Sequence, residues 1–339
     1  MEHISIVLPV LNGEETLHAC LDSILAVDYP PQLLEVVAIN DGSTDSTGRI
    51  FDSYREKFSI RGVGYTVITH EERKGRLVAR ENGARESEGP LLLFVDHRCV
   101  VSEGVLNVYT KRKYQPMISG IFQDPHKNLV STFFSMVRRF IYRPYFGKSA
   151  PDVYIDAENF DRVAKGFCPF FCDKHLFLKS LPKAKGKHVN DDTAIFKNII
   201  KKKKILRVAD SPSEYLERND FREMIWHFYE RGPRFVNFYL KIKSRYTLFL
   251  IGIIMWPILA VISVIIAWLW SPLIFLPIVL VSVGCVSLLV RSFTELLALA
   301  VAGPVLLLVF TAGVYKGVVC EVGELSVVSS GRWYPPARM

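Results

Sequence analysis

The sequence lacks a cysteine framework. Its 339 residues include six cysteines at irregular spacing, which excludes a small scaffold held together by disulfides. Cys168 and Cys172 are separated by three residues, whereas zinc ribbons and redox pairs use two. We therefore expect reduced thiols that pack among apolar side chains.

The N-terminus lacks the features of a signal peptide. No Lys or Arg precedes its first apolar run, Ile4–Leu11, and that run ends in Asn-Gly-Glu-Glu rather than in a small-residue cleavage site. We therefore expect the N-terminal part of the chain to stay in the compartment where it is made.

Charge is missing from two long C-terminal stretches. No Asp, Glu, Lys, Arg, Asn, Gln or His occurs in the 45 residues from Tyr246 to Val290, and residues 296–315 are a second uncharged stretch of 20. Because roughly 20 apolar residues cross a bilayer core, these stretches predict three transmembrane spans, with the first stretch divided at Trp270-Ser271-Pro272. The alternative is the buried helical core of a soluble protein.

The remaining charge lies before the first span. The first 245 residues hold 38 of the 42 basic and 31 of the 34 acidic side chains, a net charge of +7, with Lys241, Lys243 and Arg245 at the boundary. This distribution fits the positive-inside rule. We expect a multi-pass protein of the cell membrane with a cytoplasmic N-terminal domain, and the side of the C-terminal tail is left open.

The first hundred residues alternate between strand and helix patterns. Short β-branched runs predict strands, and helical spacing of apolar residues follows each of the first three runs. Such alternation predicts an α/β fold with a mostly parallel sheet, in which ligands bind at the carboxyl ends of the strands. The predicted strands are 4–10, 34–39, 65–69 and 91–95, and the predicted helices are 14–26, 44–58 and 75–87.

Polar residues of particular types stand where these strands end. Cations there can hold a diphosphate, carboxylates can hold ribose, base or a divalent metal, and Gly42 and Gly75 allow close backbone approach. Each residue taken alone could be a solvated turn residue, but their joint placement predicts one binding site. The residues are Asn12, Glu14, Asp41, Lys74, Arg76 and Asp96.

Five segments together resemble the family 2 glycosyltransferases, which are inverting enzymes with a GT-A fold. The segments are IVLPVLNGEETL (6–17), CLDSIL (20–25), INDGSTDST (39–47), KGRLVARENGA (74–84) and LFVD (93–96). The resemblance implies a nucleotide-diphosphate sugar as donor, with Glu14 and Asp41 on the nucleoside. The donor-binding residues that it implies are Pro9, Val10, Asn12, Glu14, Asp41, Lys74, Arg76, Asp96 and Arg98.

The sequence departs from the family at its Asp-x-Asp motif, which reads Asp96-His97-Arg98. The resemblance implies Mg²⁺ or Mn²⁺ at Asp96, and one carboxylate with diphosphate oxygens can still coordinate such an ion. Arg98 could instead bind the diphosphate directly or turn to a carboxylate at the surface. Strand alternation predicts that His97 points to the opposite face from Asp96 and is structural.

An inverting transfer needs a general base for the acceptor hydroxyl. By match to the family's Glu-Asp pair, about a hundred residues beyond the metal motif, Asp192 is the base and Asp191 its companion. The competing interpretation is an acidic first turn, which the helix dipole favours. Both interpretations can hold for adjacent residues.

Residues 219–245 mix aromatic and basic side chains, which is typical of helices lying in the membrane interface. Within this segment Arg231 and Arg234 resemble a degenerate Gln-x-x-Arg-Trp motif, which implies contact with acceptor or diphosphate, although a snorkelling Arg is the alternative. The basic run 201–204 lacks the aromatic residues of a nucleic-acid module. We therefore expect no nucleic-acid partner.

These observations predict a membrane glycosyltransferase that moves a sugar to a lipid-linked or glycolipid acceptor. We expect a catalytic domain over 1–218, interfacial helices over 219–245, spans over 246–316 and a tail over 317–339. A non-catalytic membrane protein that binds nucleotide sugars is one alternative, and a processive polysaccharide synthase is another. The oligomeric state, the sugar and the nucleotide are left open.

Overall fold

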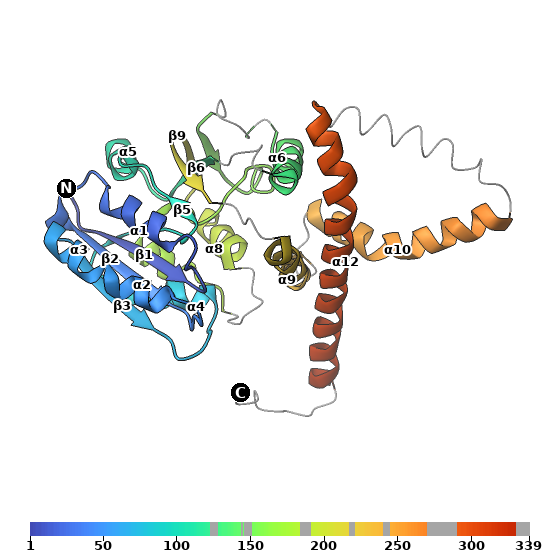
Figure 1. Ribbon diagram of the computed structural model, residues 1–339, viewed down its shortest axis with the longest axis horizontal. Helices are drawn as coiled ribbons and strands as arrows, with labels where there is room; N and C mark the ends of the chain where they lie inside the picture. Colours follow the sequence, from blue (N-terminus) through green and yellow to red (C-terminus); the bar gives the residue numbers. More distant parts are fainter. Residues whose placement is uncertain are drawn as a thin grey trace. The chain divides into compact units, whose positions relative to one another are not determined.

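The computed structural model describes residues 1–122, 128–143, 145, 151–183, 191–216, 221–239, 245–269 and 290–329. The chain divides into two compact units, which are described separately (Figure 1). The N-terminal unit comprises Met1–Asp124 and Ile141–Glu217. The helical unit comprises Pro125–Phe140 and Arg218–Met339. The chain therefore leaves the N-terminal unit after Asp124, returns to it at Ile141 and leaves it again after Glu217.

The N-terminal unit begins with four parallel strands, at the predicted apolar runs. These strands are β1 (Ile4–Val10), β2 (Leu34–Asn40), β3 (Gly64–Thr69) and β4 (Leu91–Phe94), in the order β3-β2-β1-β4. The helices between them are α1 (Leu17–Leu25), the short 3₁₀ helix η1 (Pro31–Leu33), α2 (Thr47–Ser53), α3 (Arg55–Arg61) and α4 (Arg76–Glu86).

The single helix predicted over 44–58 is wrong, because the segment forms two helices that meet at Tyr54. The Tyr54 side chain is buried, and its hydroxyl donates a hydrogen bond to Asp22 of α1 at 2.8 Å. The residue between the two helices is therefore held against α1. The apolar pattern along the segment did not reveal this break between α2 and α3.

The rest of the sheet is mixed. β8 (Phe170–Asp173) pairs antiparallel with both β4 and β6 (Met117–Phe122), and β9 (Ile205–Tyr215) runs parallel to β6. β5 (Cys99–Val100) and β7 (Val153–Ile155) pair antiparallel with β9. The helices of this half are α5 (Val105–Arg112), α7 (Lys174–Leu178) and α8 (Asp191–Ile200). The predicted α/β class is confirmed.

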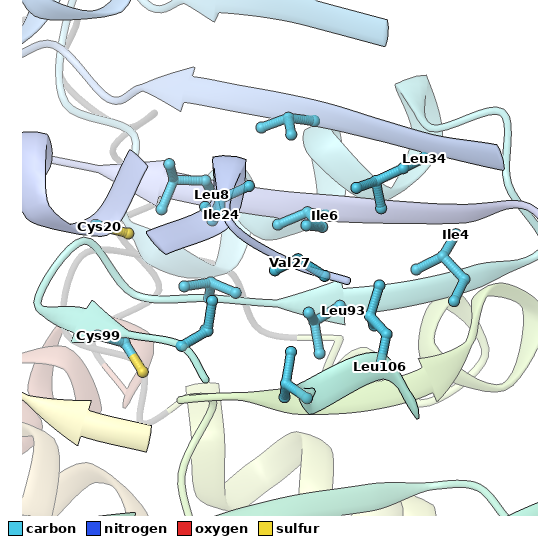
Figure 2. Packing of buried hydrophobic residues seen from close by; sticks show 14 of the residues in the cluster. Ile4, Ile6, Leu8, Cys20, Ile24, Val27, Leu34, Leu93, Cys99 and Leu106 are labelled. Carbon is cyan, nitrogen blue, oxygen red and sulfur yellow. The ribbon is translucent and has the colours of Figure 1, made fainter. Parts of the chain in front are cut away.

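Each face of the sheet carries its own apolar core. Ile4, Ile6 and Leu8 of β1 pack with α1 and its neighbours (Figure 2). Val7 points to the opposite face and packs with residues of α4. Cys168 belongs to the first core and Cys172 to the second, and both thiols are free. The prediction of apolar packing for this pair is confirmed.

The helical unit contains α6 (Leu129–Ile141), α9 (Phe221–Tyr239), α10 (Arg245–Leu269) and α12 (Phe293–Ser329). Two stretches of these helices are long and apolar enough to cross a membrane, namely Tyr246–Ile266 and Phe293–Cys320. Of the three predicted spans, the one between residues 270 and 289 lies outside the described residues.

α9 packs closely along α12 through glycines. Phe228 contacts Phe310, Gly232 lies against Gly313, and Gly317 lies against Pro233 and Val236. Contacts advance along both helices together, so the two helices run in the same direction. A Cβ added at Gly232 or Gly313 would overlap backbone atoms of the other helix, which explains why this contact needs glycine.

Candidate active site

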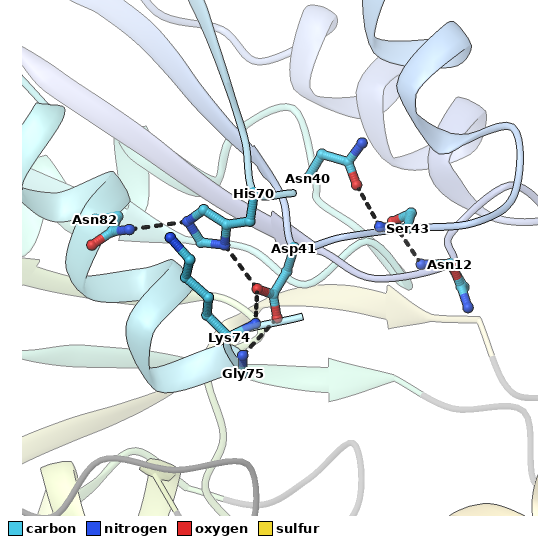
Figure 3. A network of polar contacts seen from close by, with 8 residues as sticks. All are labelled: Asn12, Asn40, Asp41, Ser43, His70, Lys74, Gly75 and Asn82. Atoms are coloured by element: carbon cyan, nitrogen blue, oxygen red, sulfur yellow. Dashed lines mark hydrogen bonds and ion pairs between the residues drawn. The ribbon is translucent and has the colours of Figure 1, made fainter. Parts of the chain in front are cut away.

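The loops after β1 and β2 are tied to each other by side chains. The Asn12 N–H donates to Ser43 Oγ at 3.0 Å, and Asn12 Oδ1 accepts the Thr44 N–H at 2.9 Å (Figure 3). Glu14 and Asp45 form a second reciprocal tie: the Glu14 N–H donates to Asp45 at 3.0 Å, and a Glu14 oxygen accepts the Ser46 N–H at 3.1 Å. Asn12 and Glu14 therefore shape this edge of the sheet.

Asp41 follows β2 and is almost completely buried, at 2% exposure. Its carboxylate accepts the N–H groups of Lys74 and Gly75, both at 2.9 Å, and contacts His70 Nδ1 at 2.8 Å (Figure 3). Asn82 Nδ2 lies 3.0 Å from His70 Nε2. Asp41 thus holds the loop that carries Lys74 into α4, and its predicted contact with a nucleoside stays a prediction.

Gly42 lets the same two loops lie close together. Its φ of +71° lies in the left-handed region, and a Cβ there would meet backbone atoms of Glu72 and Arg73. Gly75, with φ of +96°, precedes the first residue of α4. Both glycines adopt positive φ, and the expected approach of their backbone to a ligand stays a prediction.

Asp96 stands just beyond β4 in a cationic environment. Burial raises the pKa of Asp96, but His97, Arg76, the Arg98 N–H and Arg80 lower it, so that the net shift is downward. The Arg98 N–H donates to Asp96 Oδ1 at 3.2 Å. Asp96 is therefore an ionised carboxylate whose neighbours on α4, Arg76 and Arg80, are one helical turn apart on one face.

The prediction that His97 points away from Asp96 is wrong. β4 ends at Phe94, so residues 95–98 form a turn in which strand alternation does not apply. His97 Nε2 lies 3.8 Å from Asp96 Oδ1, while Nδ1 lies 2.9 Å from Thr16 Oγ1. His97 therefore links Asp96 to the start of α1.

Asp192 joins the same charged group through α4. Arg80 Nη1 donates to Asp192 Oδ1 at 2.5 Å, and the Arg80 guanidinium lies over the Phe167 ring at 4.0 Å. The Arg80 side chain is 3% exposed and the Asp192 side chain 29% exposed. Arg80 is thus fixed in the interior, whereas the carboxylate that it holds reaches solvent.

The other predicted site residues have varied positions. Pro9 and Val10 lie within β1, paired with Ile39 and Asn40 of β2. Arg98 is buried, at 4% exposure, so it does not turn to the surface. Asp191 is the first residue of α8, and its side chain lies outside the described residues.

Arg231 and Arg234 belong to α9 of the helical unit. Their neighbour Glu230 lies 3.5 Å from Lys316 of α12. Their predicted contact with acceptor or diphosphate stays a prediction.

Metal ligands are sparse in the described part of the chain. No group of three or more His, Cys, Asp or Glu side chains is placed there to hold an ion. Asp96 offers a single carboxylate. Because Mg²⁺ keeps several waters and uses one or two carboxylates together with substrate phosphates, Asp96 fits as a lone protein ligand.

Sequence reasoning missed Arg80, Phe167 and His70 as parts of this arrangement. Arg80 and Asp192 are 112 positions apart, so no local pattern links them. The available signal was the spacing of Arg76 and Arg80, which predicts two guanidinium groups on one face of a helix.

Part of the chain is similar in sequence to known proteins. Residues 5–167 match the family described as Glycosyl transferase family 2. Glycosyltransferase AglE of Haloferax volcanii is 30% identical over 96 residues, which cover 28% of this chain and 30% of AglE. The chain aligns with about a third or less of the length of the first curated relatives.

Two solved structures share the fold. Mannosyltransferase PcManGT from Pyrobaculum calidifontis, in complex with GDP-Man and Mn²⁺, superposes with a TM-score of 0.56 at 16% identity, covering 94% of this chain and 87% of that one. TarS 1–349 of S. aureus, in complex with UDP-GlcNAc, gives 0.51 at 17% identity, covering 70% and 67%. Residues 5–167, a little under half of the chain, are therefore similar to glycosyl transferase family 2, and the α/β fold is of the GT-A type.

Proposed function

We propose that this protein is an inverting membrane glycosyltransferase. It transfers a sugar from a nucleotide-diphosphate donor to a lipid-linked or glycolipid acceptor, with Asp192 as the general base. The observation that carries the proposal is the position of Arg80. Arg80 contacts Asp192 directly and lowers the pKa of Asp96, so the base and the donor-site carboxylate belong to one charged group.

The chemistry follows from this group. The acceptor oxygen attacks the anomeric carbon as its proton passes to the Asp192 carboxylate, and the bond between that carbon and the diphosphate breaks on the opposite side. The nucleoside diphosphate leaves with the bonding electrons. Arg80 orients the Asp192 carboxylate before the transfer through the hydrogen bond that it donates.

Arg76 and Lys74 supply positive charge for the diphosphate at the start of α4, where the helix dipole also favours an anion. Asp96 would hold Mg²⁺ or Mn²⁺, which supplies further charge neutralisation at the phosphates. PcManGT is described in complex with GDP-Man and Mn²⁺, and TarS with UDP-GlcNAc, which supports a nucleotide-sugar donor here.

Two candidate spans in the helical unit support a membrane location. We place the N-terminal unit in the cytoplasm, with an acceptor that the membrane holds by its lipid. Arg231 and Arg234 of α9 belong to the same helical unit as both spans and would bind the phosphate of such an acceptor.

The decisive experiment measures turnover and donor binding separately. The full chain in nanodiscs is assayed with UDP- and GDP-sugars and polyprenyl phosphate acceptors, and wild type is compared with Asp192→Asn. We expect turnover to fall about 10²- to 10⁴-fold while the donor Kd changes little. Asp52→Asn is the matched control, because this carboxylate is exposed and pairs only with Arg55 among the contacts described.

The same measurements test the competing function. A non-catalytic nucleotide-sugar-binding protein would bind the donor and give no turnover with any acceptor. Turnover that survives in Asp192→Asn would remove the assigned base and keep the transferase activity. Extension of a single acceptor by many sugars would favour the processive synthase.

A further inference from the structure

α6 belongs to the helical unit although the chain on both sides of it belongs to the N-terminal unit. Residues 125–140 group with the C-terminal helices, and the chain re-enters the N-terminal unit at Ile141. The sequence did not predict this excursion. The contacts that α6 makes with α9 and α12 explain why it belongs to the unit that holds both candidate spans.

Aromatic packing fixes α6 to α12 and α9. Phe133 lies against Gly303 of α12, where a Cβ would be 3.3 Å from the ring. Phe134 packs against Phe228 of α9, with ring centroids 4.9 Å apart. These rings surround a small core of Met224, Ala302 and Leu306. One face of α6 is therefore already occupied within the helical unit.

A two-pronged ion pair fixes the last turn of α6 to the first turn of α12. Arg139 Nη1 and Nη2 donate to the two carboxylate oxygens of Glu295 at 2.7 and 2.9 Å. Glu295 also accepts the Arg291 N–H at 2.8 Å and is 8% exposed. Such a paired geometry fixes orientation as well as distance.

The ion pair between Arg139 and Glu295 lies at one end of a candidate span. The apolar window of α12 begins at Phe293, so Glu295 and its partner Arg139 mark one end of that candidate span. The end of a span lies near the headgroups. The C-terminal turn of α6, fixed to this end, is therefore held at headgroup depth.

The side chain that α6 leaves exposed suits that depth. Phe140 is 68% exposed at the C-terminal end of the helix. Exposed aromatic rings of this kind occur on interfacial helices, which insert them into a bilayer. On α3 of the N-terminal unit, Ile60 is 80% exposed, and both candidate spans belong to the other unit.

We propose that α6 is a membrane-interface helix whose Phe140 inserts among lipid chains beside the end of the α12 span. The helix then attaches the chain to the bilayer at a second point. This point lies between the two chain segments that form the N-terminal unit. The inference rests on the proposed membrane crossing by α12.

The test places a spin label at position 140. Phe140→Cys is made in a background of Cys320→Ser and Cys285→Ser, because the other cysteines are buried. The chain is reconstituted in nanodiscs that contain anionic lipid, and collision with oxygen is compared with collision with a water-soluble nickel complex. Ile60→Cys is the aqueous reference, and Leu248→Cys, 75% exposed within the other candidate span, is the lipid reference.

We expect the label at 140 to favour oxygen at least several-fold over the label at 60, approaching the value at 248. A label at 140 that behaves like the one at 60, or that neither reagent reaches because a protein partner covers it, overturns the proposal. If the label at 248 also lies in water, the membrane anchoring itself fails, which separates the two proposals.

Tryptophan fluorescence tests the insertion of residue 140 without a spin label. Phe140→Trp in nanodiscs with brominated lipid should show more quenched emission than wild type. If brominated lipid does not quench the extra tryptophan fluorescence of Phe140→Trp, this side chain does not insert into the bilayer. This result would contradict the proposal whatever the spin label shows.

Discussion

Arg80 of α4 donates to the carboxylate of Asp192 on α8 at 2.5 Å, and its guanidinium lies over the Phe167 ring, 4.0 Å from the ring centroid. Phe167 in turn stacks on Phe196, which is four residues after Asp192 on the same helix. The proposed base is therefore held from two sides, by an ion pair at its carboxylate and by a ring packed under its helix.

Replacement of Arg80 should impair catalysis more than donor binding. In Arg80→Lys the ammonium is a point charge without the planar fork, so we expect kcat to fall about 10- to 100-fold. Arg80→Ala removes the hydrogen bond to the carboxylate altogether, so kcat should fall at least as far as in Arg80→Lys.

The control for this prediction is on the same helix. Arg85 pairs with Glu81 and its side chain is 62% exposed, so Arg85→Ala should leave kcat and its pH profile near wild type. An equal loss in Arg85→Ala would show that α4 responds to any loss of charge, and would contradict a particular role for Arg80.

Asp41→Asn should loosen the loop before α4. The new amide places an N–H₂ group where an oxygen now accepts the N–H of Lys74 or Gly75, which leaves a buried donor without its acceptor. We expect the free energy of unfolding to fall by about 1–3 kcal/mol, measured by urea denaturation. Asp52→Asn, at an exposed carboxylate, is the control and should change it by less than about 0.5 kcal/mol.

Asp96 should give a pH-dependent contribution to stability with a defined sign. Its folded-state pKa is below the ordinary value of 3.8, because His97, Arg76, the Arg98 N–H and Arg80 outweigh burial. The ionised form therefore stabilises the folded protein above the unfolded-state pKa, and this contribution is lost as pH falls through the folded-state value.

The measurement compares wild type with Asp96→Asn across pH. The difference in free energy of unfolding should be constant from about pH 7 to about pH 5 and shrink only below about pH 4. A difference that already disappears near neutral pH would mean that cations do not stabilise this carboxylate.

Donor binding should depend on metal in part. With Asp96 as the lone carboxylate and guanidinium groups beside it, chelator should weaken binding of UDP or GDP about tenfold and leave it measurable by calorimetry. Asp96→Asn should remove the effect of chelator. Complete loss of binding in chelator would mean that the arginines do not hold the diphosphate.

The sequence predicted the parts of this protein that local patterns encode. The apolar runs of β1 to β4 and the glycines at 42 and 75 were found because their signals lie within a few residues. The partners of β4 and β6 along β8, and the pairs Arg80–Asp192 and Arg139–Glu295, join positions from about 50 to more than 150 residues apart. Nothing in a single sequence gives those distances, so α6 and Arg80 became visible only in the structure.

The glycine contact between α9 and α12 should be the most sensitive point of the helical unit. A methyl at Gly313 would overlap the Tyr229 carbonyl, so Gly313→Ala forces the helices apart and exposes the Phe228–Phe310 contact. We expect a loss of about 1–3 kcal/mol, measured by thermal unfolding in detergent. Gly252→Ala on α10 is the matched control, because a Cβ there meets nothing within 4 Å and alanine favours the helix. If both variants unfold at the same temperature as wild type, α9 does not depend on this close approach, and its packing along α12 must come from the aromatic contacts alone.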